Sequence, residues 1–213
     1  KKQITAHTDT IPVYIHPVPL SSIGSYIAMD NAQNIAISIV QRTLRGELPR
    51  PDVHTFFDPD TFTASHIVRD PGGDACAIID SVLDFDYASG RTAETSAMRM
   101  ADHIRENGLH TQWVLETHAH ADHLSAAPLL ISQLGGRLAI GKHITTVQNV
   151  FGKIFNAGTE FARDGTQFDE LFEDGDQFQI GGLQGIALHV PGHTPACMAY
   201  VIGDTVFTGD TLF

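Results

Sequence analysis

The sequence predicts an α/β fold, and three observations favour this class. From Val53 onward, short β-branched runs alternate with segments of helical periodicity. The 213 residues correspond to about 1.4 domains, which predicts one domain with an appendage. The hydrophobic fraction of 42% is enough for a sizeable core that needs no disulfide bond. Disorder of the chain as a whole is therefore excluded.

The charge of the chain excludes several classes of partner. Thirteen Lys and Arg stand against 25 Asp and Glu, a formal charge of −12 that repels phosphate backbones and anionic lipid. No apolar run is long enough to span a membrane, and the Lys-Lys start is not followed by a signal-peptide core. We therefore expect a soluble, cytoplasmic protein with no nucleic-acid or membrane partner, in which Cys76 and Cys197 are reduced.

The first 52 residues are predicted to form an arm that carries one helix. Residues 11–20 hold too many prolines for a central strand and predict an extended segment. A helix is expected to begin at Asp30 or Asn31, with an apolar face that docks on the main domain or on a partner subunit. Residues 48–52 are the predicted linker. The apolar positions of this helix are Ile35, Ile39, Val40 and Leu44.

The second predicted unit covers residues 53–213 and follows in alternating elements. A hairpin is expected over 66–69 and 76–79, because the residues between them favour a turn. Helices are predicted over 92–107, 128–134 and 144–155, and strands over 113–116, 138–140, 174–180, 185–190, 198–202 and 205–208. A run of phenylalanines is assigned to the core or a subunit interface, with a pocket role open for one or two of them: Phe151, Phe155, Phe161, Phe168 and Phe172.

Three imidazoles and a carboxylate lie close together after the predicted strand 113–116. In extended backbone, His118 and His120 point the same way and can converge on one cation. Asp122 and His123 turn into the next helix and face a neighbouring point. A surface histidine cluster would explain the same residues, but two further ligand candidates occur downstream.

These two candidates each follow a predicted strand directly. His193 lies in the segment Pro-Gly-His-Thr over 191–194, and Asp210 lies in Thr-Gly-Asp over 208–210. Gly192 and Gly209 allow the backbone to approach closely beside them. The sequence therefore predicts a metal site built from three separate loops.

Together these motifs resemble the metallo-β-lactamase superfamily. The resemblance implies an αβ/βα four-layer sandwich with the metal site at the edge of its two sheets. The longer segments 116–124, 191–197 and 208–213 are similar to the persulfide dioxygenase (sulfur dioxygenase) branch, which is close to glyoxalase II. Members of the family continue with strands and helices after the Asp210 motif, so the resemblance implies that the C-terminal half of the sandwich is absent from this chain.

The resemblance to the dioxygenase branch implies one Fe(II) per chain, held by His118, His193 and Asp210. At such a site O2 and glutathione persulfide, or a similar low-molecular-weight persulfide, would give sulfite and thiol, a reaction of sulfide detoxification. In this branch the remaining residues, His120, Asp122 and His123, stay beside the metal as outer-sphere groups.

Two alternatives remain open at this point. In a thioester hydrolase of the glyoxalase II type, two Zn or mixed metals would be bound. His120 would join the first, and Asp122 and His123 would hold the second with a bridging Asp210 and one more histidine from the C-terminal part of the family fold. A metal-binding sensor or docking module without turnover is the other alternative. Formation of a homodimer is also left open.

Overall fold

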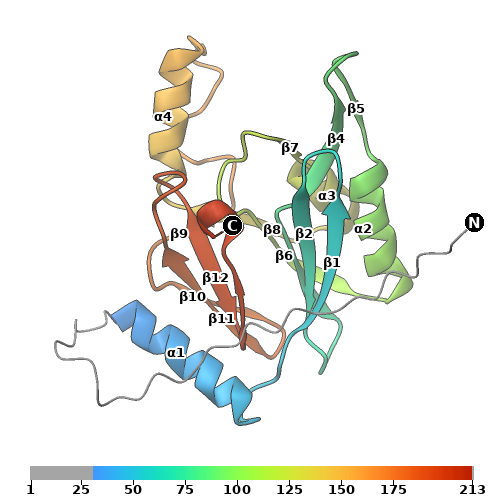
Figure 1. Ribbon diagram of the computed structural model, residues 1–213, viewed down its shortest axis with the longest axis vertical. Helices are drawn as coiled ribbons and strands as arrows, with labels where there is room; N and C mark the ends of the chain where they lie inside the picture. Colours follow the sequence, from blue (N-terminus) through green and yellow to red (C-terminus); the bar gives the residue numbers. More distant parts are fainter. Residues whose placement is uncertain (1–30, 213) are drawn as a thin grey trace, which may run out of the picture.

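The computed structural model describes residues 31–212. Two β-sheets face each other, and helices cover the outer face of each sheet (Figure 1). The layers are α2 and α3, the first sheet, the second sheet, and α1. The predicted α/β class and its four-layer arrangement are confirmed.

The first sheet has six strands in the order β1-β2-β3-β6-β8-β9. The predicted hairpin is present as the antiparallel pair β2 and β3, and β3, β6, β8 and β9 run parallel. Met100, Ile104 and Leu130 of α2 and α3 pack on its outer face. The bounds are β1 (Asp52–Asp58), β2 (Thr63–Arg69), β3 (Ala75–Ile79), β6 (His110–Leu115), β8 (Arg137–Gly141), β9 (Glu170–Phe172), α2 (Thr95–Glu106) and α3 (Ala127–Leu134).

The second sheet is antiparallel, with β10 (Gln177–Ile180), β11 (Leu183–His189), β12 (Met198–Ile202) and β13 (Thr205–Phe207) in that order. Its inner face meets the first sheet in a core that includes Trp113, Leu115, Phe178 and Tyr200. Every residue of β12 is buried, because both faces of this strand are covered. The central strands therefore hold the loops at their ends in fixed positions.

The outer face of the second sheet is covered by α1 (Asn31–Leu44), which begins where the sequence predicts. Ala32, Ala36 and Ile39 of this helix pack against Ile186 and Val201 of β11 and β12. The helix thus docks on the sheet of its own chain. The extended arm expected over residues 11–20 lies outside the described residues, and the division of the chain at residue 52 stays a prediction.

The structure differs from the predicted elements in two ways: one helix begins later than predicted, and several strands were not predicted. The helix predicted over 92–107 begins only at Thr95, because Arg91–Ala93 pairs as strand β5 with β4 (Val82–Asp86). Strand β4 also pairs with β7 (Leu124–Ser125), which completes a small third sheet, β5-β4-β7. The strands β1, β4, β5, β7 and β9 have no counterpart in the prediction, because short or exposed strands show weak alternation.

Three of the five phenylalanines assigned to the core or a subunit interface lie outside the core of this chain, and a subunit interface for them stays a prediction. Helix α4 (Ile144–Ile154) packs through Ile144 and Val147 at its first turns, and its distal end projects from the body (Figure 1). Phe172 is buried and Phe168 is half-buried. Three aromatic side chains at and beyond the distal end are exposed: Phe151, Phe155 and Phe161.

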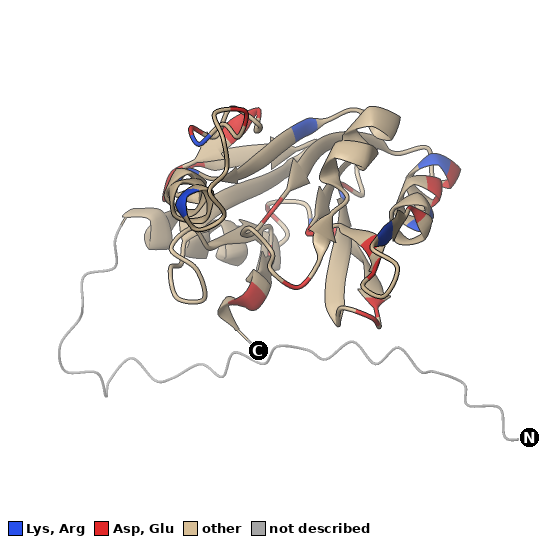
Figure 2. Cartoon of the chain, turned by 90° about the horizontal axis from the view of Figure 1, so that it is seen from above, with Lys and Arg blue, Asp and Glu red and all other residues tan. Residues whose placement is uncertain are grey.

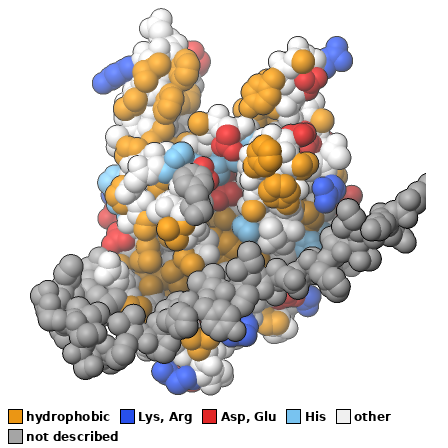
Figure 3. Space-filling view, in the orientation of Figure 1, with side chains coloured by type: hydrophobic (Ala, Val, Ile, Leu, Met, Phe, Trp, Pro, Cys, Tyr) orange, Lys and Arg blue, Asp and Glu red, His pale blue; other side chains and the backbone are white. Residues whose placement is uncertain are grey.

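A hollow lies between two projections, α4 on one side and the β4–β5 hairpin on the other. Figure 3 shows apolar side chains on both projections and histidine side chains at the base between them. In Figure 2, the Lys and Arg segments of the described part of the chain lie on separate elements and form no continuous patch. No helix in residues 31–212 is long and apolar enough to cross a membrane.

Candidate metal centre

Loops that leave the two sheets bring three of the predicted ligands together. His118 follows β6, His193 lies between β11 and β12, and Asp210 lies in the short 3₁₀ turn η1 (Gly209–Thr211) after β13. One ligand atom from each of the three lies within 4.8 Å of the others. Asp210 Oδ2 is 3.7 Å from His118 Nε2 and 3.6 Å from His193 Nε2. We call these three residues the triad.

The triad has a buried side and an open side. The His118 side chain is 1% exposed, whereas the side chains of His193 and Asp210 are 35% and 38% exposed. A backbone hydrogen bond from Met198 N–H to Thr117 O, 2.9 Å long, ties the loop after β6 to the second sheet. His193 and Asp210 are therefore the solvent-accessible members of the triad.

Hydrogen bonds orient the His118 ring. The Thr117 hydroxyl donates to Asp80 Oδ2 at 2.8 Å, and His118 Nδ1 lies 2.9 Å from the same hydroxyl oxygen. Because a hydroxyl has one proton to donate, Thr117 accepts the bond from His118 Nδ1–H, which leaves Nε2 with a free lone pair. This nitrogen is buried and has no hydrogen-bond partner.

The protonation state of His118 also fits a metal ligand. Burial lowers the pKa of His118 to about 4, and the charge of His120 acts in the same direction. The neutral ring with an unpaired, buried Nε2 is the form that binds metal ions, and a hydrogen bond on the other nitrogen is the usual support for such a ligand. The orphaned nitrogen therefore fits a metal cofactor at the triad.

The position directly before Asp210 requires glycine, and Gly209 occupies it. Its φ of +49° is in the left-handed region, and a Cβ there would lie 2.8 Å from Thr117 Cβ and 3.3 Å from His118 Nδ1. Glycine thus lets the Asp210 turn close against the pair that orients His118.

The His193 loop is closed by the buried Cys197. The thiol sulfur accepts hydrogen bonds from the Thr194 backbone N–H at 3.2 Å, and the Thr194 hydroxyl is 3.1 Å away. Val190 N–H donates to Cys197 O at 2.9 Å and joins the two ends of the loop. Cys197 and the equally buried Cys76 are both free thiols, as the sequence predicts.

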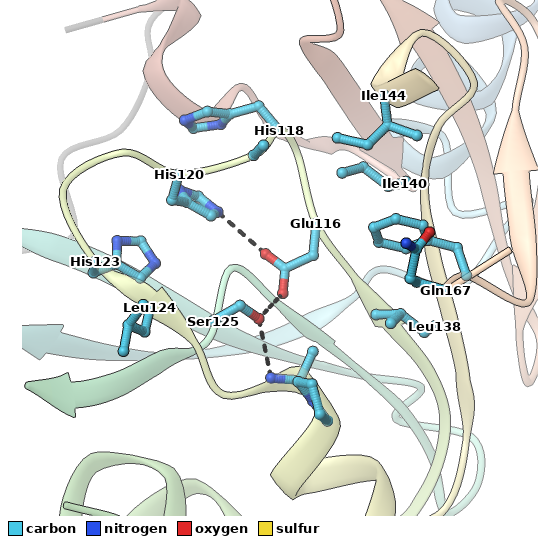
Figure 4. Close-up of a pocket in the computed structure, with 14 residues that line it drawn as sticks. Glu116, His118, His120, His123, Leu124, Ser125, Leu138, Ile140, Ile144 and Gln167 are labelled. Atoms are coloured by element: carbon cyan, nitrogen blue, oxygen red, sulfur yellow. Dashed lines mark hydrogen bonds and ion pairs between the residues drawn. The ribbon is translucent and has the colours of Figure 1, made fainter. Parts of the chain in front are cut away.

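The Nε2 of His120 is engaged by two buried carboxylates, although its ring centroid lies only 4.1 Å from that of His118. His120 Nε2 lies 3.2 Å from Asp80 Oδ1. The same nitrogen lies 3.1 Å from Glu116 Oε2, the contact that Figure 4 draws. Burial alone would lower the pKa of His120, but the hydrogen bonds to Asp80 and Glu116 outweigh it and raise the pKa to about 10. Burial raises the pKa of Glu116, whereas the bond with His120 keeps that of Asp80 low in spite of burial.

A second group of candidate ligands lies beside the triad. His120, Asp122 and His123 each offer one ligand atom within 4.8 Å of the others. Asp122 Oδ2 is 3.3 Å from His123 Nδ1, and His123 Nε2 is buried without a partner. Burial and the charge of His120 lower the pKa of His123. Asp210, which a bridged pair of metals would share, does not belong to this group.

The sequence interpretation missed Asp80, Glu116 and Thr117. Asp80 and Thr117 orient His118, and the two carboxylates hold His120. A signal was available for Asp80, which directly follows the apolar run of β3 at its carboxyl end, a common place for functional side chains. Glu116 and Thr117 follow β6 in the same way.

Sequence comparison gives relatives with different names. The chain is 52% identical over 171 residues to a protein of Burkholderia pseudomallei named "Probable metallo-hydrolase", covering 76% of this chain and 58% of that protein. It is 43% identical over 163 residues to "Glyoxylase B2" of Dictyostelium discoideum, with coverage of 76% and 56%. It is 31% identical over 158 residues to the mitochondrial persulfide dioxygenase ETHE1 of Bos taurus, with coverage of 73% and 50%. The chain thus spans between half and three fifths of each of these relatives.

Structural comparison agrees on the fold. The crystal structure of ETHE1 from Myxococcus xanthus matches with a TM-score of 0.56 and 25% identity, covering 76% of this chain and 58% of that chain. The sequence model of the Metallo-beta-lactamase superfamily matches residues 58–213, which include the loops of the triad and of the second group. Because this match covers most of the chain and the fold agrees with it, the chain belongs to the metallo-β-lactamase superfamily.

Proposed function

We propose that the protein oxidises a low-molecular-weight persulfide with O2 and water to sulfite and thiol. The reaction would take place at one Fe(II) held by His118, His193 and Asp210. The observation that carries the proposal is the triad itself: two imidazoles and one carboxylate converge within 4.8 Å, and His120 is engaged elsewhere. Two histidines and one carboxylate on one face are the ligand set of non-haem iron oxygenases.

The residues of this chain support such a site in three ways. Thr117 and Asp80 fix the His118 ring so that Nε2 faces the triad. Asp210 supplies the negative charge that a divalent cation requires. An Fe(II) bound there would supply redox chemistry and free positions for sulfur and O2, which zinc, with no redox chemistry, does not.

The open side of the triad suits a small substrate. His193 and Asp210 are each more than a third exposed, so a persulfide can approach from the hollow between α4 and the β4–β5 hairpin (Figure 3). The similarity to persulfide dioxygenase ETHE1 at 31% identity supports the same reaction class. A role in sulfide detoxification would follow from this chemistry.

A metal-dependent thioester hydrolase of the glyoxalase II type is the second candidate. It is favoured by the grouping of His120, Asp122 and His123 and by the 43% identity to "Glyoxylase B2". In that case two metal ions would activate water for attack on a carbonyl carbon. The engagement of His120 by Asp80 and Glu116 argues for the single-metal site.

Metal analysis combined with O2 uptake tests the proposal. We expect about one iron per chain and persulfide-dependent O2 consumption by protein purified without added metal. His118→Ala, His193→Ala and Asp210→Ala should each abolish iron retention, and His123→Ala should keep one iron. Two zinc ions with hydrolysis of a thioester and no O2 uptake would establish the hydrolase instead. Equal loss of iron in all four variants would refute the single-metal assignment.

A further inference from the structure

A cavity of about 380 Å³ lies next to the triad and shares His118 with it. Figure 4 shows that it extends from the histidines toward Leu138, Ile140 and Ile144. Phe168 and the first turn of α3 close it on the other sides. The wall opposite the histidines is therefore apolar.

The carboxylate and the hydroxyl group of this cavity are already engaged, and its unpartnered nitrogens, His118 Nε2 and His123 Nε2, lie at the histidine end. Glu116 Oε1 accepts a 2.5 Å hydrogen bond from the Ser125 hydroxyl, and Glu116 Oε2 lies 3.1 Å from His120 Nε2. The Ser125 oxygen in turn accepts from Ala127 N–H at 3.0 Å (Figure 4).

Gln167, at the rim, is also paired. Its amide donates to Ala162 O at 2.7 Å, and its oxygen accepts from Gln148 at 2.9 Å. Within residues 31–212, no Lys or Arg lines the cavity. A carboxylate or phosphate placed against the apolar wall of Leu138, Ile140 and Ile144 would lose its water without gaining a partner there, which is costly.

We propose that this cavity binds the apolar organic group of the substrate, an alkyl chain or a single aromatic ring, while the reacting sulfur lies at the triad. The inference rests on the proposed function and names its substrate class: persulfides with a neutral, apolar organic group. An apolar cavity of about 150 Å³ is large enough for benzene, so this one accommodates a ring with a short chain. Among residues 31–212, the apolar wall offers no partner to the charged ends of glutathione.

Binding of neutral and charged probes to the metal-free protein tests the cavity without turnover. Benzyl alcohol and benzoate share the ring and differ in charge. In methyl-resolved NMR, benzyl alcohol should produce saturable shifts of the Ile140 and Ile144 methyl signals, and benzoate should not. Absence of a saturable shift with benzyl alcohol, or equal binding of benzoate, would overturn the inference.

Substitutions at the wall and away from it provide the matched control. Leu138 is half-buried in the wall, and Leu138→Trp should weaken benzyl alcohol binding at least tenfold. Val150 is an apolar residue on the exposed side of α4, and Val150→Trp should leave binding unchanged. Should Leu138→Trp not fold, Phe168→Ala enlarges the same cavity and should favour a longer chain.

Turnover by the iron-loaded protein separates this inference from the proposed function. Along methyl, propyl and pentyl persulfide, kcat/KM should rise roughly fourfold per methylene, as expected for burial of apolar surface. Benzyl alcohol binding with no O2 uptake on any persulfide would keep the cavity assignment and reject the dioxygenase. Efficient turnover of glutathione persulfide that exceeds pentyl persulfide and ignores Leu138→Trp would keep the dioxygenase and overturn the inference.

Discussion

Replacement of Gly209 by alanine should damage both the fold and the metal site. The residue has a φ of +49°, a backbone conformation that costs an L-residue about 1–2 kcal/mol. The added Cβ would lie 2.8 Å from Thr117 Cβ, well inside the contact distance of about 3.5–4.0 Å between carbon atoms. Relief of this overlap costs a further ~1–3 kcal/mol. We therefore expect Gly209→Ala to lower the free energy of unfolding by about 2–5 kcal/mol.

The same substitution should weaken metal binding, because Thr117 must move and it orients His118. Loss of such a supporting contact typically reduces metal affinity about 10-fold to 100-fold. Urea unfolding of the metal-free protein measures the first effect, and chelator competition with zinc as the probe measures the second.

Two other glycines separate the contributions. Gly108 has a φ of +62° and no atom within 4 Å of an added Cβ, so Gly108→Ala isolates the backbone cost. Gly192 lies in the His193 loop with no such contact and no positive φ, so Gly192→Ala should change little. The reasoning is refuted if Gly209→Ala loses no more stability than Gly108→Ala and binds zinc as tightly as the wild type.

Three further predictions follow from buried groups. Ile39→Ala should lower the free energy of unfolding by about 2–4 kcal/mol, because Ile39 is buried between α1 and the second sheet. Ile37→Ala, at an exposed position of the same helix, should cost under about 1 kcal/mol. Equal losses in urea unfolding would contradict the docking of α1. The folded-state pKa of His120, about 10, lies above its ordinary value of 6.5, so protonated His120 stabilises the metal-free protein below pH 6.5 and this contribution is lost as the pH rises through 10. As the pH rises from about 7 to about 10, the free energy of unfolding should therefore fall less in His120→Gln than in the wild type, as measured by chemical denaturation. The same fall in both proteins would argue against this role of His120. Burial raises the pKa of the Cys76 thiol to about 11, so it should react with a thiol reagent only upon unfolding, and rapid labelling in native buffer would contradict its burial.

The pattern of the long elements was enough to predict most of the fold. The hairpin of β2 and β3, the helices α1 to α4 and the four strands of the second sheet all lie near their predicted positions. These segments bury a continuous face, so their apolar residues recur with a regular period. Strands such as β5 and β7 are two or three residues long and largely exposed, so no such pattern exists to detect.

Part of the candidate site was predictable for a similar reason. His118, His193 and Asp210 stand next to glycines or other histidines in recognisable motifs directly after strands. Their convergence could be expected from the rule that loops at one edge of a sheet meet. The engagement of His120 Nε2 could not, because it depends on Asp80, which lies 40 residues earlier in the chain.

The sequence by itself determined the α/β class, the candidate metal ligands and the acidic character of the chain, because these depend on composition and local spacing. Only the tertiary structure decided which nitrogen of His118 is free, which carboxylates engage His120, and that an apolar cavity adjoins the triad. Those features arise from contacts between residues far apart in sequence, and packing of the two sheets sets the distances between them.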